Sequence, residues 1–207
     1  MKMSNVLETT DPQVQSEDGT LIWAASAGCS ADQAPVIIFV PGFSSSSLTF
    51  RKQFQDENLL TKYCLVTYEP RGQCRSQQPL SESAYSSEKN AQDFKAVCDR
   101  YGVKTAVLAG WSYGGLIATD VFSHLGPGWI RGIIYLSGVP WRSMLPEVLH
   151  SDGVNALQPL IEGDTEEFNE LQRTFSIGRS NWATKSYRQT SPHECKTSRS
   201  YKVASGS

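Results

Sequence analysis

One serine stands between two glycines where an apolar run of the sequence ends. Residues 107–118 read VLAGWSYGGLIA, so Gly110, Ser112 and Gly114 form the pattern G-x-S-x-G. This spacing is typical of a sharp turn from a strand into a helix, which holds the serine hydroxyl clear of the backbone. The small residues on either side let the helix approach the strand closely. The pattern predicts that Ser112 is a nucleophile.

A serine nucleophile needs a base and an orienting acid, since the hydroxyl is weakly nucleophilic on its own. His124 ends the helix expected after the serine, about 18 Å away at roughly 1.5 Å per residue, so it is not the base. The other candidates are two histidines and the acids that precede the second of them: His150, His193, Asp152, Asp164 and Glu167. We favour the interpretation that these histidines are solvated loop side chains.

Four apolar runs are expected to form the strands that position this turn. They are VIIFV (36–40), KYCLVTYE (62–69), TAVLAG (105–110) and IRGIIYLSG (130–138). Runs without polar alternation are typical of strands buried on both faces, as in parallel sheets. Asp18-Gly19 indicates a hairpin turn before TLIWAAS, so antiparallel pairing is expected only at the N-terminal edge.

Helical patterns alternate with these strands. Apolar residues recur at helical spacing in a stretch expected to end at Gly102: Phe94, Val97, Cys98 and Tyr101. A helix over 116–125 follows the serine, and a shorter helix is expected around Phe50 and Phe54. The alternation predicts the α/β fold class, with a mostly parallel central sheet and flanking helices.

The character of the sequence changes after Pro140. Residues 141–190 carry amphipathic helical patterns such as DTEEFNELQRTF. Residues 191–207 are polar and lack apolar periodicity, so a disordered tail is expected there. The predicted organisation is a core over 1–140, followed by this helical segment and this tail.

Composition excludes several classes of function. The 207 residues suffice for one domain, and a formal net charge of −2 gives no electrostatic footprint for nucleic acid or an anionic membrane. The start lacks the apolar segment of a secretory signal, and no run approaches the roughly 20 apolar residues of a membrane helix. A cytoplasmic protein is therefore expected.

Five cysteines without a C-x-x-C pair argue against a disulfide framework and a zinc site.

Four motifs occur in an order that belongs to one family. SEDGTLIWAASAG looks like an opening hairpin, VIIFVPGFSSSS like a strand with its oxyanion loop, VTYEPRGQCRS like the loop D-x-R-G-x-G-x-S, and VLAGWSYGG like a nucleophile elbow. Together they resemble the α/β-hydrolase fold family, in the branch with a helical cap. The resemblance covers about residues 12–190 and implies that residues 141–190 form the cap.

The resemblance also implies which groups act. By analogy with the family, the backbone N–H groups of Phe43 and Tyr113 bind the oxyanion that forms when Ser112 attacks an acyl group. A serine separates the chain from the epoxide hydrolases and dehalogenases of the family, whose nucleophile is aspartate. The expected partner is a small-molecule acyl substrate. No metal or other cofactor is implied, because the reaction needs only water and a positioned triad, and a protein partner is left open.

The chain departs from the family pattern at several positions. Pro41 stands where histidine is common, Glu69 where aspartate is usual, and Gln73 and Cys74 where histidine and glycine are usual. Cys74 resists the positive φ angle that glycine accepts. Family members continue after the cap with two strands, an acid and a histidine, so the triad is expected to be incomplete in this chain.

Two interpretations remain open. In the first, the chain is the nucleophile-bearing part of an esterase-like serine hydrolase that acts on an ester or related acyl compound through Ser112. In the second, it is a catalytically inactive hydrolase-like fragment or a binding protein, and its glycines only permit a tight crossing of a helix on a strand. In the truncated state the edge of the strand containing IIYL is expected to be exposed.

Overall fold

The computed structural model describes residues 7, 13–138, 140–144 and 147. The chain divides into two compact units, Met1–Arg142 and Ser143–Ser207, and the fold below is that of the first. The predicted helical cap over 141–190 lies almost entirely outside the described residues, and the predicted tail over 191–207 does so completely.

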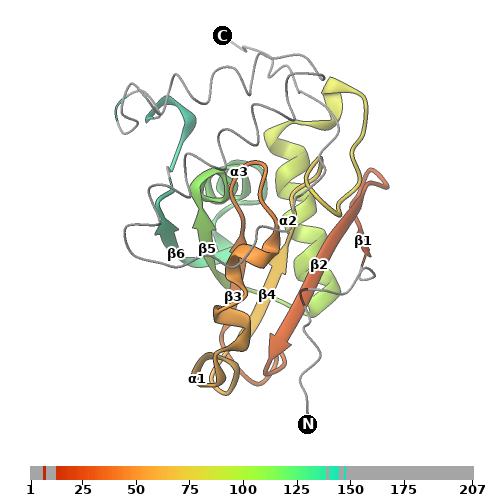
Figure 1. The fold of residues 1–207 in the computed structure, drawn as a ribbon. Helices are drawn as coiled ribbons and strands as arrows, with labels where there is room; N and C mark the ends of the chain where they lie inside the picture. Colours follow the sequence, from red (N-terminus) through yellow and green to blue (C-terminus); the bar gives the residue numbers. More distant parts are fainter. Residues whose placement is uncertain (1–6, 8–12, 139, 145–146, 148–207) are drawn as a thin grey trace, which may run out of the picture. The chain divides into compact units, whose positions relative to one another are not determined.

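One six-stranded sheet, in the order β1-β2-β4-β3-β5-β6, forms the centre of the described fold (Figure 1). The strands are β1 (Gln13–Gln15), β2 (Leu21–Gly28), β3 (Val36–Val40), β4 (Cys64–Tyr68), β5 (Ala106–Trp111) and β6 (Ile130–Leu136). Pairing is parallel from β4 through β3 and β5 to β6, and antiparallel where β2 joins β1 and β4. The predicted α/β class, with antiparallel pairing only at the N-terminal edge, is confirmed.

The hairpin between β1 and β2 turns at Asp18-Gly19, as the sequence predicts. Gly19 has a φ angle of +85°, which L side chains rarely adopt. The backbone N–H of Thr20 donates to Oδ1 of Asp18 at 3.1 Å and closes the turn. Gln15 is thereby placed opposite Leu21 in the antiparallel register.

Helices cover one face of the sheet, and short helical turns cover the other (Figure 1). The long helix α2 (Ser87–Tyr101) begins at Ser86, whose hydroxyl accepts from the N–H of Lys89, and ends at Gly102 with φ +67°. Its predicted apolar stripe packs on the sheet, together with α3 (Leu116–Leu125), which has the predicted bounds. Within the described residues, no helix is long and apolar enough to cross a membrane.

The opposite face is covered by the segment between β3 and β4. The sequence predicts one short helix here, whereas the structure has two 3₁₀ turns, Ser47–Phe50 and Gln53–Gln55, followed by α1 (Glu57–Leu60). Phe50 and Phe54 still point into the core and contact Phe39 of β3, with ring centroids 5.0 and 5.7 Å away. The apolar spacing therefore identified the buried residues, although not the type of helix.

Strand β6 forms one edge of the sheet in the described part of the chain, whereas its apolar run predicts a central strand. Ile134 and Tyr135 are 45% and 40% exposed. Two large apolar side chains of this strand are therefore accessible to solvent.

A buried guanidinium ties the first hairpin to α2. Arg71, which follows β4, donates from Nε and Nη2 to both carboxylate oxygens of Asp93, at 2.8 and 2.6 Å. Its Nη1 donates to Asp18 of the hairpin and to the carbonyl of Ala84, both at 2.8 Å. The side chains of Arg71 and Asp93 are each 1% exposed, so the pairing compensates two charges removed from water.

Replacement of Arg71 by Met should lower the free energy of unfolding by about 3–5 kcal/mol, because Asp93 would become an uncompensated buried charge. Urea denaturation at pH 7 measures this change. Lys95→Met is a matched control, since Lys95 pairs with Asp99 on the surface of α2 with 43% and 56% of the side chains exposed. This variant should lose no more than about 0.5 kcal/mol. Equal losses of unfolding free energy in the two variants would contradict the conclusion that Arg71 compensates a buried charge.

The same guanidinium makes the stability depend on pH. The hydrogen bond from Arg71 holds the pKa of Asp18 well below its ordinary value. Such a carboxylate stabilises the fold fully above the unfolded-state pKa of about 4, and this contribution is lost as the pH falls toward the folded-state pKa. Asp18→Asn should lower the free energy of unfolding by about 2 kcal/mol at pH 7. The difference from wild type should shrink between about pH 4 and pH 3 in urea titrations. A constant difference would be the contrary result.

Candidate active site

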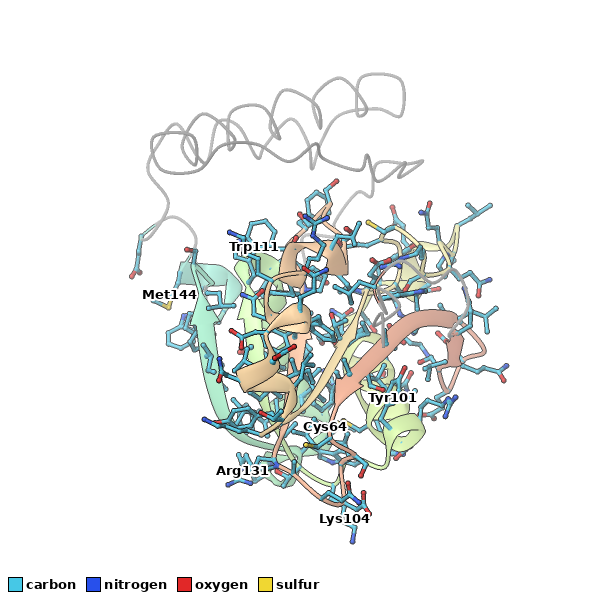
Figure 2. All side chains as sticks on the ribbon, turned by 60° about the horizontal axis from the view of Figure 1, so that its bottom comes forward. Cys64, Tyr101, Lys104, Trp111, Arg131 and Met144 are labelled. Atoms are coloured by element: carbon cyan, nitrogen blue, oxygen red, sulfur yellow. The ribbon has the colours of Figure 1, made fainter. Side chains whose placement is uncertain are left out.

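The predicted strand-to-helix turn is present at Ser112. This residue follows β5 directly and opens the 3₁₀ turn Ser112–Gly115, which continues into α3. Its φ angle is +50°, in the left-handed region that a residue with a side chain adopts at an energetic cost. The side chain is exposed, at the carboxyl end of β5. In Figure 2, Trp111 marks this end of the sheet, and Cys64 at the start of β4 lies toward the opposite end.

Two glycines permit the turn because their neighbours leave no room for a side chain. A Cβ atom on Gly114 would lie 2.2 Å from the carbonyl oxygen of Val40 in β3, and one on Gly110 would lie 2.5 Å from the carbonyl oxygen of Gly114. Atoms at these distances overlap, and backbone cannot move aside as the end of a side chain can. The pattern G-x-S-x-G is therefore a packing requirement of the bend.

The loop that follows β3 packs directly against the serine. A Cβ atom on Gly42 would lie 3.2 Å from Cβ of Ser112 and 3.0 Å from the Trp111 ring. The rings of Phe43 and Tyr113 contact each other edge to face, with centroids 6.5 Å apart and an interplanar angle of 62°. The structure thus brings together the three residues singled out from the sequence, Ser112, Phe43 and Tyr113.

Hydrogen bonds anchor the far end of this loop at Ser47. The hydroxyl of Thr67 in β4 donates to the carbonyl of Phe39 at 2.9 Å and lies 3.0 Å from the Ser47 hydroxyl. The N–H of Ser47 donates to Oε1 of Glu69 at 3.0 Å. Since Thr67, Ser47 and Glu69 are all fully buried, these bonds fix the loop between its two ends.

Glu69 is charge-compensated within its own loop. Arg75 donates to Glu69 through Nη2 at 2.6 Å, through Nε at 3.2 Å and through its backbone N–H at 2.8 Å. The guanidinium also lies 3.3 Å from the centroid of a Trp23 ring, in cation–π geometry. The departure from aspartate therefore leaves a buried carboxylate with several donors.

Cys74 adopts the conformation that its side chain disfavours. Its φ angle is +46°, so the loop makes the left-handed turn despite the replacement of glycine. Cys74 is also disulfide-bonded. The cysteine pattern, which argues against a disulfide framework, gave no indication of this bond. Cys29, Cys64 and Cys98 are free thiols, and the last two are core residues as predicted. Burial raises the pKa of Cys98 to about 12.

A polar network lies next to the turn, between α2 and α3. Nδ2 of Asn90 donates to the Tyr113 hydroxyl at 3.2 Å and to Oδ2 of Asp120 at 2.9 Å. Burial raises the pKa of Asp120, while the bond from Asn90 opposes this shift. The residue after the serine is thus connected through its side chain to both helices.

The described residues contain one histidine, His124, and it is bonded elsewhere. Its Nε2 lies 2.8 Å from the hydroxyl of Ser87 at the start of α2, on an exposed part of the surface. The remaining candidates for base and acid lie outside the described residues: His150, His193, Asp152, Asp164 and Glu167.

Sequence reasoning missed the partners of Glu69 and the hydrogen bonds of Asn90. Nothing in the spacing of Glu69 and Arg75 distinguishes them from surface charges, so their pairing had no usable signal. Asn90 did leave a signal, because it stands four residues before Phe94 and interrupts the apolar face of α2 with an amide. A polar residue on a buried helix face needs a partner.

The sequence profile of the alpha/beta hydrolase fold family matches residues 35–194. The match spans well over half of the chain, and the sheet order and strand-to-helix turn agree with it. This chain belongs to the α/β-hydrolase fold family.

Individual relatives match part of the chain. Human Protein ABHD8 is 30% identical over 110 residues, which are 53% of this chain and 25% of that protein. Epoxide hydrolase B of Mycobacterium tuberculosis is 28% identical over 119 residues, or 58% of this chain and 33% of the relative. The matches therefore span a quarter to a third of these two proteins.

Solved structures of esterases resemble a larger part. An esterase from a Rhodococcus species is 25% identical with a TM-score of 0.68, over 86% of this chain and 66% of that one. A putative aryl esterase from Burkholderia cenocepacia is 28% identical with a TM-score of 0.60, over 81% of this chain and 67% of that one.

Gly114→Ala should lower the free energy of unfolding by about 2–3 kcal/mol, because the new methyl group would overlap the Val40 carbonyl. Gly128→Ala is the control, since a Cβ atom there meets nothing within 4 Å. That variant should change stability by no more than about 0.5 kcal/mol. Urea denaturation of both variants measures the difference, and a neutral Gly114→Ala would show that the turn has space to spare.

Proposed function

We propose that this chain is a serine hydrolase that cleaves an ester or related acyl substrate through Ser112. The observation that carries the proposal is the exposed Ser112 at φ +50°, at the end of β5, with the Gly42 loop packed against its Cβ. A hydroxyl held clear of its own backbone is open to an acyl carbon. The family relationship and the resemblance to esterases support the same chemistry.

Acyl transfer creates a negative oxygen that needs donors. We assign this role to the backbone N–H groups of Phe43 and Tyr113, which belong to the two segments that meet at Ser112. Phe43 and Tyr113 also present half-buried aromatic rings beside the serine, which suit an apolar acyl or alcohol group. Serine favours acyl chemistry over the epoxide opening of family members that use aspartate.

The second candidate is a hydrolase-like protein without turnover, which binds rather than cleaves. It is favoured by the position of His124, the one histidine among the described residues, which contacts Ser87 instead of Ser112. Without a base the serine hydroxyl keeps its proton and remains a poor nucleophile. The two candidates differ in whether the complete chain activates Ser112.

A fluorophosphonate probe and an aryl ester distinguish them. The full chain should take up one phosphonyl group on the peptide containing Ser112, because the probe reacts with an activated serine. It should also hydrolyse the ester. Ser112→Ala should abolish labelling and lower kcat by at least about a thousandfold. Ser123→Ala, an exposed serine on α3, should leave both unchanged.

Two other results have defined meanings. Labelling that survives Ser112→Ala would place the nucleophile elsewhere and overturn the assignment. A wild-type chain with neither labelling nor turnover would favour the binding protein.

A further inference from the structure

Tyr113 is held from two sides. Its hydroxyl accepts a hydrogen bond of 3.2 Å from Asn90 on α2, and its ring meets the ring of Phe43 edge to face. Gly114 and Gly115, which follow Tyr113 in the turn, have no side chain with which to make such contacts. Tyr113 is therefore one side chain by which the surroundings hold the turn just after Ser112.

Asn90 is itself oriented by Asp120. A side-chain amide has two N–H donors, and Nδ2 of Asn90 donates to Tyr113 and to Oδ2 of Asp120 at 2.9 Å. The carboxylate oxygen has no hydrogen to offer, so it selects the orientation in which Nδ2 faces Asp120 and Tyr113. Asp120 belongs to α3, the helix that continues the turn. Asn90 therefore links Tyr113 in the turn to Asp120 in the following helix.

The turn needs such support. Ser112 occupies a strained backbone conformation at φ +50°, and strained residues persist only where the surrounding structure fixes them. The peptide that joins Ser112 to Tyr113 carries the N–H assigned to the oxyanion. A donor of this kind must be aimed at a defined point, and its loss typically costs about 10²–10³ in rate.

We propose that Asn90 and Asp120 are positioning residues of the active site: by holding the Tyr113 side chain they orient its backbone N–H toward the oxyanion. This inference rests on the proposed function for the catalytic role of the N–H. The holding of the turn by Asn90 does not depend on it. The two parts can therefore be tested separately.

Hydrogen exchange tests the holding of the turn in the full chain, whether or not the chain is active. Asn90→Leu removes both donors at nearly the same volume, and Tyr113→Phe removes the hydroxyl that accepts from Asn90. Each should speed exchange in peptides covering residues 111–116 about fivefold and leave peptides of β3 unchanged. Gln92→Leu is the matched control, because it removes an amide of α2 that accepts from Nζ of Lys89 at 3.0 Å. This variant should leave exchange unchanged in both sets of peptides.

Ester kinetics test the catalytic part. The oxyanion forms only as the transition state is reached, so a displaced donor weakens transition-state binding and not substrate binding. Asn90→Leu should therefore lower kcat about tenfold with KM within twofold of wild type. Tyr113→Phe should do the same. The double variant should also lose about tenfold rather than a hundredfold, because both changes break the same contact, that between Asn90 and Tyr113. Asp120→Asn should give a smaller loss in the same parameter.

Each outcome decides one of the two claims. Unchanged exchange at residues 111–116 in both single variants would overturn the inference, and Tyr113→Phe provides this readout if Asn90→Leu fails to fold. An increase in KM with an unchanged kcat would also overturn the inference. So would a double variant in which the two losses in kcat multiply. An inactive wild type with accelerated exchange in the variants would refute the proposed function and retain the holding of the turn by Asn90.

Discussion

The approach of two backbones, at Gly114 and Val40, is the constraint on which the site depends. The bend after β5 brings Gly114 so close to the end of β3 that any side chain there would overlap the Val40 carbonyl. This approach places Ser112 beside Gly42 and strains it into a positive φ angle. The exposed hydroxyl is therefore a consequence of how two neighbouring parallel strands end, since both deliver their loops to the same edge of the sheet.

Buried and half-buried polar groups connect the two segments beside Ser112 to the rest of the fold. Glu69 and Thr67 of the β4 segment hold Ser47, at the end of the loop that contains Gly42. Asn90 of α2 holds Tyr113, the residue that follows the serine. The close approach of the backbones fixes the bend, and these hydrogen bonds further restrict the two segments beside it.

Much of the fold was predictable because it follows from local patterns. The run at 36–40 and the helix over 116–125 have the predicted bounds, since an unbroken apolar run and a helix between glycine-rich turns are strong local signals. The 3₁₀ turns around Phe50 were not predicted, because apolar spacing identifies a buried face without fixing the hydrogen-bond pattern. The apolar run of β6 predicts a central strand, whereas the strand lies at an edge of the described sheet, because that position depends on neighbouring strands and not on the run itself.

The candidate site also contains residues that local patterns predict and residues that they do not. Ser112 could be singled out because a bend of this kind demands glycines at fixed offsets, whereas Asn90 and Glu69 act through tertiary contacts with residues 23 and 22 positions away. The replacement of glycine by Cys74 is instructive, since its φ of +46° shows that the loop is imposed by its surroundings rather than by its own preferences. The loop is fixed by two ion pairs, one between Arg75 and Glu69 and one between Arg71 and Asp93. A motif residue can therefore change type when enough of its neighbours determine the backbone.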